Sequence, residues 1–83
     1  KRTKKMIQEK LYNLIKTALE VESITIDDLI DTVEAWDSLA QLSILVAIDQ
    51  ETEGRASKIT ELATALSVKK LIDILEKNDL ISE

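Results

Sequence analysis

Apolar side chains recur every three or four residues along the first part of the chain, with Lys and Glu at many of the positions between them. This spacing places apolar side chains on one face of an α-helix. It therefore predicts a first helix from about Lys4 to Leu19. The residues of the apolar face are Ile7, Leu11, Leu14, Ile15 and Leu19.

The following stretch, residues 20–38, is rich in Asp, Glu, Ser and Thr and shows no sustained period. It predicts a long loop, a feature that is uncommon in compact domains and is often functional. Thr25 is suited to cap a single helical turn in "TIDD". Four apolar residues of the loop are expected to lie against the helices: Ile24, Ile26, Leu29 and Ile30.

Helical spacing returns at Leu39 and predicts a second helix that ends near Glu53. Gly54, the one glycine, is suited to a left-handed helix stop. "TELATAL" predicts a short third helix capped by Thr60, and "SVKKLIDILEKNDL" predicts a fourth helix capped by Ser67. The expected fold is all-α: a four-helix bundle with a long loop between helices one and two. The residues of the last helix that should face inward are Val68, Leu71, Ile72 and Leu75.

Composition narrows the chemistry open to this chain. Its 83 residues are 45% hydrophobic but only 2% aromatic, so aliphatic packing must stabilise it. The absence of Cys and His excludes disulfides, the usual zinc or iron ligand sets, and nucleophiles that depend on Cys or His. A carboxylate pair would still need a cleft, for which a domain of this size rarely has room. The composition therefore indicates a protein that is not itself an enzyme.

Charge divides the chain into a basic start and an acidic body. The net charge is −5, although "KRTKK" alone carries four of the 11 basic residues. Residues 1–5 are expected to be a solvated tail or linker, and residues 6–83 a single, monomeric domain. An acidic body repels nucleic acid and anionic membranes, so neither is an expected partner. Because neither a membrane span nor a signal-peptide core is visible, we expect a cytoplasmic location.

Ser38 interrupts an otherwise apolar run, "VEAWDSLAQLSILVAI", at the start of the second helix. Capping is one explanation, because Ser38-Leu39-Ala40-Gln41 fits the S-x-x-Q capping box and Asp37 is also a good cap. The other explanation is chemical. An exposed hydroxyl at a helix N-terminus is suited to carry a phosphate, which the first-turn N–H groups and the helix dipole favour. The local pattern alone leaves both explanations open.

The stretch "WDSLAQLSILVAIDQETEG" resembles the D-S-L signature of acyl carrier proteins and their peptidyl carrier relatives. The resemblance covers nearly the whole chain. It includes the four-helix outline, the long first loop, Gly54, and "SVKKLIDIL", which is similar to the T-V-x-x-L-V-x-x-I of the family's last helix. In that family a separate transferase esterifies the serine with 4′-phosphopantetheine from coenzyme A. The resemblance thus implies an acyl-carrier-type bundle in which Ser38 holds acyl or aminoacyl groups as thioesters on this arm.

The resemblance also implies roles for the neighbours of Ser38. The expected partners are a phosphopantetheinyl transferase, an acyl- or aminoacyl-loading ligase, and downstream transferases or synthases. Leu39 and Val46 match positions that meet such partners, and the full set of expected contact residues is Asp37, Leu39, Gln41, Val46 and Asp49. Some members shelter an acyl chain between helices. The matching positions, which suit an ordinary core equally well, are Leu42, Ile44, Leu45 and Ile48.

Helix two departs from the carriers of fatty-acid synthesis, which are densely acidic there. Ala40, Gln41 and Ser43 are neutral, and Glu53 stands where those carriers often have Phe. Lower acidity should weaken docking to the basic patches of fatty-acid enzymes. Trp36 gives the W-D-S-L form that resembles discrete carriers of specialised pathways, although a loop aromatic that plugs the core explains it too. These departures favour a dedicated carrier over central fatty-acid synthesis.

A non-covalent acidic helical adaptor is the alternative function. It explains the charge and the helices equally well, but it gives Asp37-Ser38-Leu39 no role beyond capping. A carrier-like domain that has lost its modification is a third possibility, and the intact serine opposes it. Covalent modification of Ser38 separates the carrier from the adaptor.

Overall fold

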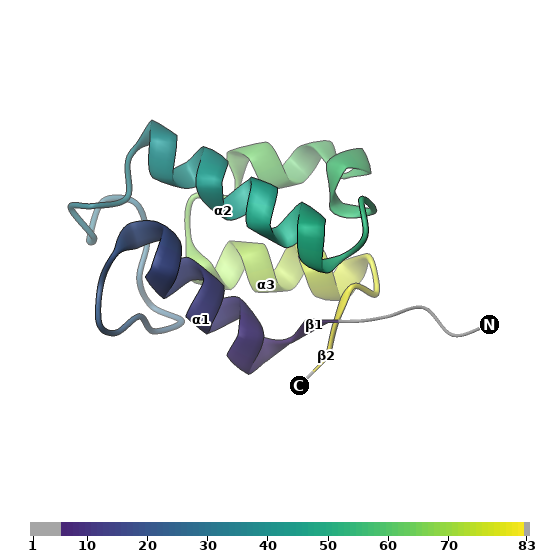
Figure 1. Ribbon diagram of the computed structural model, residues 1–83, viewed down its shortest axis with the longest axis horizontal. Helices are drawn as coiled ribbons and strands as arrows, with labels where there is room; N and C mark the ends of the chain where they lie inside the picture. Colours follow the sequence, from purple (N-terminus) through teal and green to yellow (C-terminus); the bar gives the residue numbers. More distant parts are fainter. Residues whose placement is uncertain (1–5, 83) are drawn as a thin grey trace.

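The structure is a computed structural model that describes residues 6–82; the predicted basic tail, residues 1–5, and Glu83 lie outside the described residues. Three α-helices enclose one aliphatic core: α1 (Gln8–Leu19), α2 (Ser38–Glu51) and α3 (Val68–Lys77) (Figure 1). The prediction of a mostly helical chain is confirmed. The predicted four-helix bundle is not, because residues 6–82 contain only these three α-helices. Within the same residues, no helix is long and apolar enough to cross a membrane.

The predicted third helix forms as 3₁₀ structure instead, in two short segments, η1 (Ala56–Lys58) and η2 (Thr60–Thr64). Thr60 is the first residue of η2 and not a side-chain cap. Buried residues of this stretch, Leu62 and Ala65, are three positions apart, which matches the three-residue turn of a 3₁₀ helix. Their carbonyl groups are the acceptors of a side-chain amide from α2, as described below, so they are satisfied without an α-helix.

A two-stranded parallel ladder joins the two ends of the described chain. β1 (Met6–Ile7) pairs with β2 (Ile81–Ser82), and the N–H of Met6 donates to the carbonyl of Leu80 (3.0 Å). Met6 and Ile81 are both buried in the core. The first helix therefore begins at Gln8 and not near Lys4, because Met6 and Ile7 are extended to make this pairing.

The long loop is fixed at its middle to the start of α3. The N–H of Ile30 donates to the carbonyl of Leu66 (2.9 Å), and the N–H of Val68 donates to that of Asp28 (3.0 Å). Ile24 and Ile30 pack on the core as expected, whereas Ile26 is exposed. Thr25 accepts the N–H of Asp27 (3.3 Å) within a turn and not at the start of a helix.

The α3 helix follows its prediction closely. The hydroxyl of Ser67 accepts the N–H of Lys70 (3.1 Å), which confirms Ser67 as the cap. The four residues that were expected to face inward are all buried: Val68, Leu71, Ile72 and Leu75.

Each α-helix is followed, within two residues of its last residue, by an acidic residue in the left-handed conformation. The three are Glu20 (φ 57°), Glu53 (φ 58°) and Asp79 (φ 62°). After α1, the N–H of Val21 returns to the carbonyl of Lys16 (3.1 Å), which is the long hydrogen bond of a Schellman motif. Gly54 makes the same bond after α2 (2.8 Å, to Asp49) at φ 85°, so its predicted left-handed conformation is confirmed, one residue beyond Glu53.

Replacement of Glu20 by glycine should therefore stabilise the fold. Glu20→Gly removes the side-chain strain of a left-handed residue and an acid at a helix C-terminus, and we expect the free energy of unfolding to rise by about 1 kcal/mol. Urea unfolding followed by Trp36 fluorescence measures it. Glu22→Gly is the matched control, because it removes the same charge from an exposed loop position without a positive φ. A loss of stability in Glu20→Gly would contradict this explanation.

Candidate functional site

Ser38 is the first residue of α2, and its side chain is exposed. The helix is capped by the residue before it: the N–H of Ala40 donates to Asp37 Oδ1 (2.9 Å), and the backbone of Asp37 is extended. The predicted capping box between Ser38 and Gln41 is therefore not formed, because Ser38 is already inside the helix. Within residues 6–82 the hydroxyl of Ser38 makes no hydrogen bond.

The exposed face of α2 beside Ser38 is apolar. Leu39, Leu42 and Val46 are exposed by 76%, 57% and 49%, and they succeed one another at helical spacing. The other exposed side chains of the helix, Ser43 and Gln50, are uncharged. We call Leu39, Leu42 and Val46 the apolar stripe.

Two other predicted contact residues, Asp37 and Asp49, use their carboxylates in hydrogen bonds within the fold. Asp37 is exposed, but its carboxylate is engaged in the helix cap. Asp49 is partly buried, and its carboxylate accepts the N–H of Ser57 in η1 (2.9 Å).

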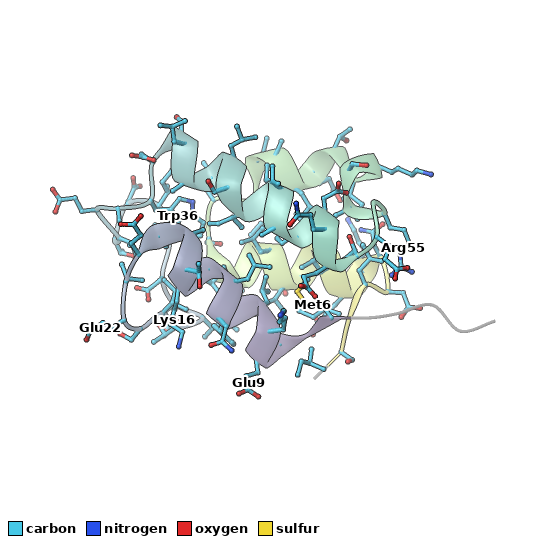
Figure 2. The ribbon with its side chains drawn as sticks, in the orientation of Figure 1. Met6, Glu9, Lys16, Glu22, Trp36 and Arg55 are labelled. Carbon is cyan, nitrogen blue, oxygen red and sulfur yellow. The ribbon has the colours of Figure 1, made fainter. Side chains whose placement is uncertain are left out.

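Gln41 was predicted as a partner contact, but it is only 8% exposed and has a structural role. Its Oε1 accepts the indole N–H of the buried Trp36 (2.7 Å). Its Nε2 donates to the carbonyls of Ala65 (3.1 Å) and Leu62 (3.4 Å). We call this connection the Trp36–Gln41 bridge. It joins the end of the loop, where Trp36 lies in Figure 2, to the η2 segment.

The four acyl-pocket candidates divide between core, surface and groove. Ile44 and Ile48 are fully buried in the core, and Leu42 is exposed. Leu45 lines a surface groove of about 520 Å³ between α2 and the η1–η2 segments. The lining of this groove is largely apolar, and it comes from α2 (Leu45, Val46, Asp49, Gln50) and from the η1–η2 region (Ala56, Ser57, Ile59, Thr60, Leu62, Ala63).

The charge near Ser38 is strongly one-sided. From Thr17 to Gly54 the sequence contains ten acidic residues and no Lys or Arg. Exposed acids of the loop, Asp31 and Glu34, precede the site along the chain. A partner that approaches Ser38 therefore meets an apolar helix face next to a negatively charged loop.

The structural role of Gln41 has a signal in the sequence. A buried indole N–H needs an acceptor, and Gln41 follows Trp36 by five residues. Gln41 also shares a helix face with Ile44 and Ile48, at spacings of three and four residues. Its polarity suggested the surface, but its position in the helix indicated the core.

Asp37 and Ser38 should differ in their effects on stability, because only Asp37 caps the helix. Asp37→Ala should lower the free energy of unfolding by about 1 kcal/mol. Ser38→Ala should change it by less than about 0.5 kcal/mol, as expected for an exposed side chain without partners. Urea unfolding of both variants measures the difference. Equal losses in the two variants would mean that Ser38 shares the capping role.

Comparisons of the chain with models of protein families, with curated proteins and with solved structures find no match. A functional inference must therefore be built on the residues around Ser38. The features that bear on it are the unbonded hydroxyl, the apolar stripe, the acidic loop and the groove along α2.

Proposed function

We propose that this chain is a carrier domain on which Ser38 is the attachment site for 4′-phosphopantetheine. The observation that carries the proposal is the division of roles between two adjacent residues. Asp37 caps α2, and Ser38 is left with an exposed hydroxyl that has no hydrogen bond among the described residues. The D-S-L motif, the position of the motif at a helix start and the acidic body all support the same proposal.

The start of α2 suits a phosphodiester. The backbone N–H groups of Ser38 and Leu39 make no hydrogen bond within residues 6–82, as expected for the first turn of a helix. These groups and the positive end of the helix dipole favour a negative group on the Ser38 oxygen. The residues present therefore fit the arm, and its attachment needs no rearrangement of a buried side chain.

The proposed reaction is a phosphoryl-type transfer from coenzyme A. The hydroxyl oxygen of Ser38 bonds to the phosphorus on the pantetheine side of the pyrophosphate. The bond from that phosphorus to the bridging oxygen breaks, and 3′,5′-adenosine bisphosphate leaves. A transferase must supply the base that takes the hydroxyl proton, since the serine makes no hydrogen bond to a base in the part of the chain described. The attached arm supplies a thiol on which acyl or aminoacyl groups are carried as thioesters.

The surroundings of Ser38 favour a dedicated carrier for a specialised pathway. The apolar stripe would meet partner enzymes by burial of apolar area, with the acidic loop as the charged part of the contact. Aliphatic cargo has a candidate shelter in the groove along Leu45, which is lined mainly by apolar side chains. Ile44 and Ile48 are core residues and would not line this groove.

Loading of Ser38 is the direct test of this function. After incubation with coenzyme A, Mg²⁺ and a broad-specificity phosphopantetheinyl transferase, intact mass spectrometry should detect one added phosphopantetheine on the wild type. Ser38→Ala should gain nothing. Ser43→Ala is the matched control, because Ser43 is an exposed serine of the same helix, and it should load as the wild type does.

Two results would contradict the proposal. Loading of Ser38→Ala would show that the site is wrong. Failure of the wild type with several different transferases would favour the alternative, an acidic adaptor that binds a basic partner without covalent modification. Ten acids without a base between Thr17 and Gly54 are the feature that favours this alternative.

The apolar stripe should contribute to recognition by the transferase. Leu42→Ala removes a side chain that is 57% exposed, one helical turn from Ser38, and should raise the transferase KM about fivefold. Ile7→Ala is the control, since Ile7 is 49% exposed but belongs to β1. Its KM should equal that of the wild type. Steady-state loading rates measure both, and an equal effect of the two substitutions would remove the stripe from the proposed contact.

A further inference from the structure

The loop segment that carries Asp37 is connected to distant parts of the chain by few contacts: the Trp36–Gln41 bridge and the packing of Val33 on the core. The backbone hydrogen bonds of Thr32, Val33, Trp36 and Asp37 all reach acceptors within four positions along the chain. By contrast, the middle of the loop is tied to distant residues at the start of α3. The buried indole of Trp36 bonds to Gln41, five positions further along the chain, and Gln41 makes the long-range connection through its bonds to the carbonyls of Leu62 and Ala65.

The amide of Gln41 uses its hydrogen-bonding groups in two directions. Oε1 accepts from Trp36, and Nε2 donates to two carbonyls at and just beyond the end of η2. One planar group thus fixes the loop that ends at Ser38 relative to a wall of the groove, because Leu62 also lines that groove. No buried side-chain polar atom of the described residues lacks a partner, so this arrangement is fully satisfied.

We propose that Gln41 is a positioning residue for the modification of Ser38. Through Trp36 it holds the Trp36–Asp37–Ser38 segment in the conformation that the transferase binds. The proposal rests on the proposed function. Gln41 does not contact the transferase or coenzyme A, because its side chain is buried on the inner face of α2. Its effect is to raise the fraction of molecules in which the segment is already ordered before the transferase binds.

Loss of the bridge should have a distinct kinetic signature. When only a fraction of the molecules is competent to bind, the apparent affinity falls by that fraction, whereas the bound complex reacts normally. Gln41→Met keeps the size of the side chain and removes all three hydrogen bonds. It should raise the transferase KM about fivefold, which corresponds to the net free energy of about one hydrogen bond, and it should leave kcat unchanged.

Trp36→Phe tests the other end of the bridge. It removes the indole N–H and leaves the two bonds from Gln41 to η2 in place. KM should rise here as well, and the double variant Trp36→Phe/Gln41→Met should be no worse than the more affected single variant, because residues that act as one unit are not additive. Additive effects would contradict the bridge.

Thr52→Val separates positioning from stability. Thr52 is a buried polar residue at the opposite end of α2, where its hydroxyl accepts the N–H of Ala56 (3.1 Å) and donates to the carbonyl of Ile48 (2.9 Å). It lies about 16 Å further along the helix axis, from the rise per residue. The urea midpoint should fall in this variant, as in Gln41→Met, but the transferase KM should stay at the wild-type value.

The outcomes are distinguishable. Suppose that the wild type is loaded. If the KM of Gln41→Met is then unchanged, or no higher than the KM of Thr52→Val, the role of Gln41 is overturned and the proposed function stays intact. A fall in kcat with constant KM also overturns it, because the defect would then lie in the reaction itself. A wild type that no transferase loads overturns the proposed function and the positioning role together.

Discussion

The rotational setting of α2 is the constraint on which the site depends. Hydrophobicity alone does not select it, because Leu39, Leu42 and Val46 are as apolar as the buried Ile44 and Ile48. One polar residue on the inner side, Gln41, reaches the indole N–H of Trp36 and the carbonyls of Leu62 and Ala65 only in the observed setting. A rotated helix would withdraw Gln41 and leave the buried indole N–H of Trp36 without its acceptor, at a cost of about 1–3 kcal/mol. This penalty keeps the apolar stripe, and Ser38 beside it, on the surface.

Much of the fold was predictable where one local pattern decided it. Ser67 caps α3, Gly54 is left-handed, and Leu11, Ile15 and Leu19 fall on the buried face of α1, as their spacing required. The pairing of β1 with β2 was not predictable, because Met6 and Ile81 are far apart in sequence and each strand has only two residues. The third helix was not recognised as 3₁₀ because Leu62 and Ala65 fit both helical periods, and the bonds of their carbonyls to Gln41 join residues more than twenty positions apart.

The candidate site was predictable in its attachment residue and less so in its neighbours. Ser38, Leu39 and Val46 are exposed, as the motif implied. The capping box failed because two adjacent residues, Asp37 and Ser38, can both cap, and the choice depends on where the extended backbone of the loop ends. Gln41 was misplaced because its polarity suggested the surface, whereas its position on the helix and the buried Trp36 indicated the core.

The free hydroxyl of Ser38 and the apolar stripe together favour transient partners. Exposed apolar side chains are common singly, but a row of three on one helix face is typical of a contact surface. An uncharged face leaves little for salt to screen, so long-range attraction must come from the loop, where Asp31 and Glu34 are exposed. Charge would then control the association rate of a partner. Burial of the apolar stripe would control its residence time. A carrier of the proposed kind must leave each enzyme between steps, and the small apolar area of three side chains would keep each contact short.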